Sequence, residues 1–220
     1  MKNLMGVIIG GRYARLTSTV VVLSTLLAVS PAAIAQSAGK FQITTHLGYR
    51  MGGEFEDYAS GRKLNVSDDQ SYGFSIESIA GPSGIEYGLF YSLQQTQLET
   101  GGLSPSINVD TLDVEYIHLR GKRRMSNNSG LYSVGSLGVT RFDPDAPALS
   151  SESRFSLGAG GGIEKPLSPR ISLQLEGRGF ATFFDSSGAL FCSSQGSCSV
   201  TVAGSIFLQF EVAAALVFRF

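Results

Sequence analysis

The sequence offers few side chains that could carry out catalysis. Its two histidines, His46 and His118, are the strongest candidates for a general base, because histidine fills that role most often in enzymes. A histidine that activates a serine nucleophile must lie within hydrogen-bond reach of it. No His-x-Ser motif, which would place the two residues close together along the chain, occurs in the sequence. A pair formed across two strands stays open as the alternative. We therefore expect a protein that is not an enzyme and that uses no cofactor.

A glycine-rich run at residues 158–162 has the composition of a phosphate-binding loop but lacks its pattern. The Lys-Ser/Thr pair of a P-loop does not follow it, and the spacing of a dinucleotide-binding motif fails at Ile163. Glycine within a strand more often marks strong curvature or the close approach of a large side chain. We expect the run to have a structural role.

Two cysteines, Cys192 and Cys198, are separated by five residues in the segment CSSQGSC. In an exported protein, cysteines this close favour a disulfide. A metal pair is the alternative, but no histidine or third cysteine lies beside them, so no metal site is predicted. A disulfide here would order the tip of a loop, and a pre-ordered tip suits recognition at the cell exterior.

The N-terminus has the organisation of a secretory signal peptide. Lys2, Arg12 and Arg15 precede an apolar run at 16–30, and an A-x-A cleavage pattern follows at 33–35. An uncleaved anchor is the alternative, but fifteen residues fall short of the ~20 that a spanning helix needs. We predict a signal peptide at 1–35 and an exported domain at 36–220.

Composition favours a β-sheet domain without a nucleic-acid partner. Residues 36–220 carry 14 basic and 18 acidic side chains, a net charge of −4, so the basic surface of a nucleic-acid-binding protein is missing. The chain has 27 Gly, 14 Phe and 8 Tyr but only 7 Pro. With repeated alternation of apolar and polar residues, this composition indicates an all-β sandwich or barrel.

Alternation with a period of two recurs eight times, which predicts eight strands. They cover residues 41–50, 71–78, 84–94, 110–119, 131–142, 154–165, 170–183 and 205–220. The connections between them are long and short in turn. An even number of strands with short turns at one end and long loops at the other is typical of an outer-membrane barrel. We predict an all-β, eight-stranded antiparallel up-and-down transmembrane β-barrel.

Alternation alone does not decide which face of the barrel is apolar. A lipocalin-like soluble barrel would turn the apolar face inward. Three features favour lipid on the outside instead: the strands are long, the polar faces are rich in Gly and Ser with little Lys, and Tyr and Phe lie near the strand ends. The predicted partner of the wall is therefore membrane lipid.

The signal peptide, the eight alternating strands and the aromatic C-terminus resemble the small outer-membrane β-barrel family that includes outer membrane proteins A, X and W. Phe218 and Phe220 match the aromatic-x-aromatic end of that family's C-terminal signal, while Ala213 and Ala215 depart from its polar and glycine positions. The resemblance implies a monomer in the cell outer membrane, inserted by the barrel-assembly machinery and in contact with lipid and lipopolysaccharide.

The polar faces of the strands carry charges that we expect inside the barrel. They are His46, Arg50, Glu77, Glu86, Asp113, Glu115, Glu164, Glu176, Arg178, Glu211 and Arg219. Buried charges need partners, so we expect an acidic–basic network that plugs the lumen. The protein would then act in envelope integrity or bind a surface ligand through its loops. The alternative is a narrow porin-like channel, biased towards cations by the acidic excess of this set.

Overall fold

The computed structural model describes residues 41–56, 63–78, 84–100, 111–125, 130–145, 150–184, 189–192, 198–201 and 206–220. The signal peptide predicted at 1–35 lies outside these residues. Nowhere in them is there a helix both long enough and apolar enough to cross a membrane.

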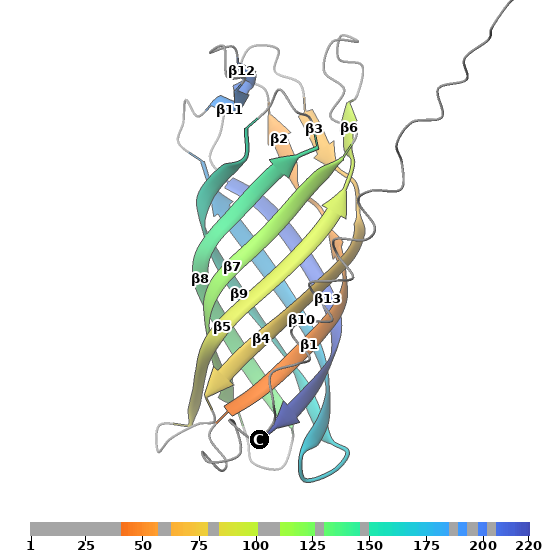
Figure 1. Ribbon diagram of the computed structural model, residues 1–220, viewed down its shortest axis with the longest axis vertical. Coiled ribbons are helices and arrows are strands. Elements are labelled where there is room, and N and C mark those ends of the chain that lie inside the picture. Colours follow the sequence, from red (N-terminus) through yellow and green to blue (C-terminus); the bar gives the residue numbers. More distant parts are fainter. Residues whose placement is uncertain are drawn as a thin grey trace, which may run out of the picture. The chain divides into compact units, whose positions relative to one another are not determined.

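Eight antiparallel strands form one closed barrel, as the sequence predicts (Figure 1). They are β1 (Phe41–Met51), β4 (Asp69–Ser78), β5 (Ile85–Thr96), β7 (Leu112–Arg124), β8 (Leu131–Pro144), β9 (Glu152–Pro166), β10 (Ile171–Phe183) and β13 (Ile206–Arg219). Each strand pairs with its neighbours along the chain, and β13 returns to pair with β1 from Arg219 opposite Gln42 to Phe210 opposite Met51. Closure of the ladder leaves no strand edge unpaired, which a wall in lipid requires.

Short turns and long loops lie at opposite ends of the barrel. The end that holds the C-terminus is the one at which β4 is followed by β5, β7 by β8, and β9 by β10 (Figure 1). The opposite end carries the longer connections and two small sheets. One joins β2 (Glu54–Glu56), β3 (Lys63–Val66) and β6 (Leu98–Thr100), and the other joins β11 (Ala189–Cys192) and β12 (Cys198–Thr201). By the usual orientation of such barrels, the short turns face the periplasm.

The wall of the barrel is apolar outside and polar inside. Leu89, Leu119 and Phe210 point outward and are each nearly 60% exposed, whereas Arg50 and Gln209 point into the lumen and are fully buried. A soluble barrel would show the opposite polarity, since water would solvate its charged face and not its leucines. The outer surface is therefore suited to lipid.

At its long-loop end, β7 has the opposite phase from the one the sequence predicts. Leu112 and Val114 are fully buried in the lumen, while Asp113 and Glu115 lie on the outer face. The Tyr91 hydroxyl donates to Glu115 at 2.9 Å, and Arg141 lies 3.7 Å from the same carboxylate. Acidic side chains on the outer face are tolerated near the membrane interface, where water reaches them. The placement of Asp113 and Glu115 in the lumen is thus wrong.

Candidate functional site

Buried ion pairs fill the lumen near the short-turn end. The Lys122 Nζ lies 2.6 Å from Glu86 Oε2 and 3.3 Å from Glu77 Oε2. The Gln42 amide donates to Glu77 at 2.6 Å and to Glu86 at 2.7 Å. Each carboxylate therefore has both a cation and a neutral donor, which is the condition under which a buried charge is stable.

Glu164 is the carboxylate with which the cations closest to the short-turn end form ion pairs. It lies 3.0 Å from Arg124 Nη2, and it also pairs with Arg219, which comes from the last strand. Gln174 donates to it at 2.7 Å. Arg124 reaches Glu86 as well, at 3.3 Å, so this group is joined to the ion pairs of Lys122.

Midway along the barrel, Arg120 connects two carboxylates on opposite sides of the lumen. Its guanidinium lies 3.0 Å from Glu77 on β4 and 2.6 Å from Glu176 on β10. Glu176 also lies 3.4 Å from Arg178 and accepts a hydrogen bond from the Tyr132 hydroxyl at 2.9 Å. Since every member has more than one partner, removal of a single cation would leave no carboxylate entirely unpaired.

The network ends towards the long loops at Arg50. Its guanidinium lies 2.6 Å from Glu211, which Arg178 also contacts at 2.6 Å. Arg50 donates further to Ser92 and lies over the Tyr116 ring, 4.7 Å from its centroid. In order along the lumen, the continuous series of ion pairs runs through Glu86, Lys122, Glu77, Arg120, Glu176, Arg178, Glu211 and Arg50.

Apolar side chains fill the lumen beside this series and towards the long loops. Tyr116 stacks on Phe180 with centroids 4.1 Å apart, and Phe142 meets Phe207 edge-on at 5.3 Å. The cluster consists of Val66, Phe90, Leu112, Val114, Tyr116, Phe142, Phe180, Phe184 and Phe207. Among the described residues, this cluster therefore fills its part of the lumen with packed apolar side chains.

Both histidines lie inside the barrel. His118 bonds Ser136 through Nδ1 at 2.9 Å and Ser156 through Nε2 at 2.7 Å, so the cross-strand His–Ser contact left open by the sequence exists. Within the described part of the chain no carboxylate contacts His118, and the ring is 1% exposed. His46 contacts Ser75 at 3.4 Å and packs edge-on against Phe90. Neither ring is open to a substrate from solution.

Glycines on the lumen face of β9 make room for the large side chains of its neighbours. A Cβ at Gly160 would lie 2.8 Å from the Cβ of Arg178, and one at Gly162 would lie 2.6 Å from the Tyr132 hydroxyl. This close approach agrees with the structural role expected for residues 158–162. The glycines thereby let Tyr132 and Arg178 reach Glu176.

Three cations of the network, Arg120, Lys122 and Arg124, are not predicted from the sequence, because the strand predicted there ends at residue 119. The signal was present, since the alternation that begins at His118 continues through all three. Their inclusion changes the charge balance. The lumen carboxylates are Glu77, Glu86, Glu164, Glu176 and Glu211, against the cations Arg50, Arg120, Lys122, Arg124, Arg178 and Arg219. The acidic excess expected from sequence is not present in this network.

Comparisons with known proteins agree on the architecture. No protein-family model matches the sequence, and no curated protein matches it either. Neisserial surface protein A is similar in structure, with a TM-score of 0.53 at 12% identity over 82% of this chain and 97% of that one. OprG from Pseudomonas aeruginosa is similar with a TM-score of 0.48 at 14% identity, over 83% and 96%.

The chain has the fold of a small outer-membrane β-barrel. This fold, together with an apolar wall around a charged lumen, places the barrel in the cell outer membrane. Membrane lipid therefore surrounds the outer face of the barrel.

Two further predictions concern local features of the barrel. The backbone ladder of β11 and β12 sets Cys192 opposite Cys198, and the disulfide between them stays a prediction. Phe218 and Phe220 lie at the short-turn end, where the Phe220 amide donates to the Phe41 carbonyl at 3.1 Å. Recognition of these two residues by the assembly machinery likewise stays a prediction.

Proposed function

We propose that this protein is a non-enzymatic outer-membrane barrel that acts in envelope integrity or surface interaction through its extracellular loops. In this proposal the lumen is a structural plug that fixes the shape of the barrel, and the loops carry the activity. The barrel acts as a monomer.

The filled lumen is the observation that carries the proposal. The cavity lined by Phe90, Arg120 and Arg178 has a volume of only ≈ 10 Å³, about the space of one water probe. On one side of it lie the ion pairs, and on the other side lies the apolar cluster. At this level of the barrel, passage of a solute would require the displacement of several of these buried side chains.

The long-loop end also has structure of its own. The β2–β3–β6 sheet is tied to the barrel rim by a hydrogen bond from the Val66 amide to the Gly53 carbonyl at 2.9 Å. Nearby, the Gly52 amide donates to Asp68 at 2.9 Å. A pre-ordered surface loses less entropy on binding than a flexible one does, which supports a role in recognition.

Loop replacement tests the proposal directly. Residues 54–65 would be replaced by a short Gly-Ser linker, and in a second variant residues 189–201 would be replaced in the same way. The matched control replaces the periplasmic turn at residues 167–170. We expect the loop variants to fold but to lose antibiotic resistance or adhesion, while the control keeps both. Folded loop variants with unchanged envelope integrity and adhesion would contradict the proposal.

A narrow ion channel is the second candidate, and one observation favours it. The series of ion pairs is continuous, and each inner carboxylate is shared by two cations. Shared partners allow alternative pairings, and rearranged charges can open an ion path. Discrete conductance steps of the purified protein in a planar bilayer would support this function over the structural one.

A further inference from the structure

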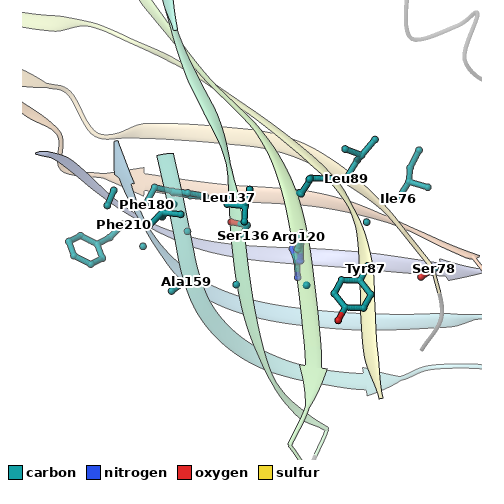
Figure 2. Close-up of a pocket in the computed structure, with 18 of the residues that line it drawn as sticks. Ile76, Ser78, Tyr87, Leu89, Arg120, Ser136, Leu137, Ala159, Phe180 and Phe210 are labelled. Atoms are coloured by element: carbon teal, nitrogen blue, oxygen red, sulfur yellow. The ribbon is translucent and has the colours of Figure 1, made fainter. Parts of the chain in front are cut away.

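A groove of ≈ 1020 Å³ runs along the outer surface of the barrel (Figure 2). Its floor follows one row of paired residues across neighbouring strands, namely Tyr87, Gly121, Gly135, Ala159, Gly179 and Phe210. The next row forms a ridge above the floor, with Leu89, Leu119, Leu137 and Leu157 in succession. The groove therefore results from a row of small residues beside a row of leucines.

The floor of the groove is open at its centre, while near its ends the rings of Tyr87 and Phe210 lie 3.7 Å and 3.4 Å from where a Cβ of Gly121 and of Gly179 would stand. A Cβ placed on Gly135 would meet no atom within 4 Å. The ridge leucines Leu119 and Leu137 are more than half exposed. Along the floor, Tyr87 and Phe210 lie near opposite ends of the groove, with Ala159 between them (Figure 2).

The groove rises through about one leaflet of the membrane. Tyr87 lies near the start of β5, at the short-turn end, whereas Phe210 lies near the start of β13, at the long-loop end. Five strand spacings of about 4.8 Å separate them, a path of about 24 Å. On a wall tilted by about 45° this path rises about 17 Å, against about 15 Å for half of the hydrocarbon core.

The course of the groove favours a flexible chain as its occupant over a second copy of the barrel. Its floor crosses β5, β7, β8, β9, β10 and β13, which are six of the eight strands of the barrel. Another copy of this protein is convex and rigid, so it could contact only a few neighbouring strands at once. A lipid acyl chain can follow the curved row along its whole length.

A positive charge lies beside the short-turn end of the groove. Arg123 follows Gly121 on the outer face of β7 and is exposed. Among the described residues no ion pair involves Arg123. Its register partners are Ile85 and Ser133, so no carboxylate neutralises it across the strands. An arginine at the periplasmic interface attracts the phosphate of an anionic lipid.

We propose that this groove seats an acyl chain of an anionic phospholipid of the periplasmic leaflet, with Arg123 bound to its phosphate. The small residues provide the space, the leucine ridge provides apolar contact, and the arginine selects the headgroup. The proposal depends on the wall alone and is independent of what the loops do.

Tryptophan quenching tests the site, because the chain contains no Trp of its own. Leu137→Trp places one fluorophore on the ridge, and Leu47→Trp places a control on the outer face away from the groove. Both variants would be folded into phosphatidylcholine vesicles that contain brominated phosphatidylglycerol or brominated phosphatidylcholine. At Leu137→Trp we expect phosphatidylglycerol to bind about three- to fivefold more strongly than phosphatidylcholine. At Leu47→Trp we expect equal binding.

Matched second substitutions separate the charge from the groove. Added to Leu137→Trp, Arg123→Gln should abolish the preference, while Lys165→Gln, which removes an exposed cation outside the groove, should leave it. Gly135→Leu should fill the groove and lower the preference, while Gly177→Leu, at an equally open position outside it, should not. Unboiled migration on a gel checks that each variant is folded.

Two outcomes would overturn the proposal. The first is equal quenching by both lipids at Leu137→Trp, or a preference that Arg123→Gln leaves intact. The second is weak quenching by both lipids together with a dimer that Gly135→Leu dissociates, which would assign the groove to a second copy of the protein.

Discussion

Replacement of Arg120 by methionine should destabilise the folded barrel by about 3 kcal/mol. Removal of one partner of a buried ion pair costs about 3–5 kcal/mol when the other charge is left uncompensated. Arg120 lies 3.0 Å from Glu77 and 2.6 Å from Glu176, but both carboxylates keep a second cation, Lys122 at 3.3 Å and Arg178 at 3.4 Å. We therefore expect the lower end of that range. Methionine retains the apolar volume of the arginine stem, so the effect reports on charge.

The free energy of unfolding would be measured by urea titration in lipid vesicles, with the fraction folded read from unboiled gel migration. Arg141→Gln is the control, because Arg141 pairs with Glu115 on the outer face and is 43% exposed. We expect little change for the control, as exposed ion pairs contribute little. The double variant Arg120→Met with Glu77→Gln should regain part of the loss. Equal stability of Arg120→Met and Arg141→Gln would refute the view that the lumen charges hold the barrel together.

Three further predictions address other parts of the molecule. Gly162→Ala should destabilise the barrel by about 1–3 kcal/mol, since its Cβ would collide with the Leu175 carbonyl oxygen and would lie 2.6 Å from the Tyr132 hydroxyl; an unchanged urea midpoint would contradict this. Without reductant, Cys192 and Cys198 should not react with a thiol reagent in urea, and they should react after reduction; reaction before reduction would exclude the disulfide. Expression of the protein should leave the mass spectrum of lipid A unchanged, because His118 is enclosed in the lumen; altered acylation would indicate an enzyme.

Much of the fold could be predicted because side chains alternate between the two faces of a strand. A wall in lipid requires an apolar side chain at nearly every outward position, so the alternation is regular. In β13, Leu208 and Phe210 point outward and Gln209 and Glu211 point inward, as the alternation indicates. The prediction fails where the alternation continues but the apolar residues face the lumen and the polar residues face outward. Where β7 begins, at the long-loop end, the lumen is apolar and the outer face is polar, so Leu112 and Asp113 lie on the faces opposite to those that the sequence predicts.

The candidate site could be predicted only in part, since a strand's sequence does not reveal what lies across the barrel. Glu176 and Glu211 are recognisable as inward charges from their own strands. That Arg120 bridges from β7 to a carboxylate on β10 depends on the circumference of the barrel and on its register. The groove on the outer wall depends on register in the same way, because its small residues Gly121, Gly135, Ala159 and Gly179 come from four different strands and align only when these strands are paired.

The ion pairs of the lumen have a consequence for insertion into the membrane. Arg50 on β1 contacts Glu211 on β13, and Arg219 on β13 contacts Glu164 on β9, so the network is complete only when the first and last strands have met. An open sheet would present unpaired charges and unpaired edge amides to the hydrocarbon. A half-inserted chain therefore has two free-energy costs, one from unpaired charges and one from unpaired backbone amides. The barrel should enter the bilayer cooperatively, and the pairing of β1 with β13 should be the last step.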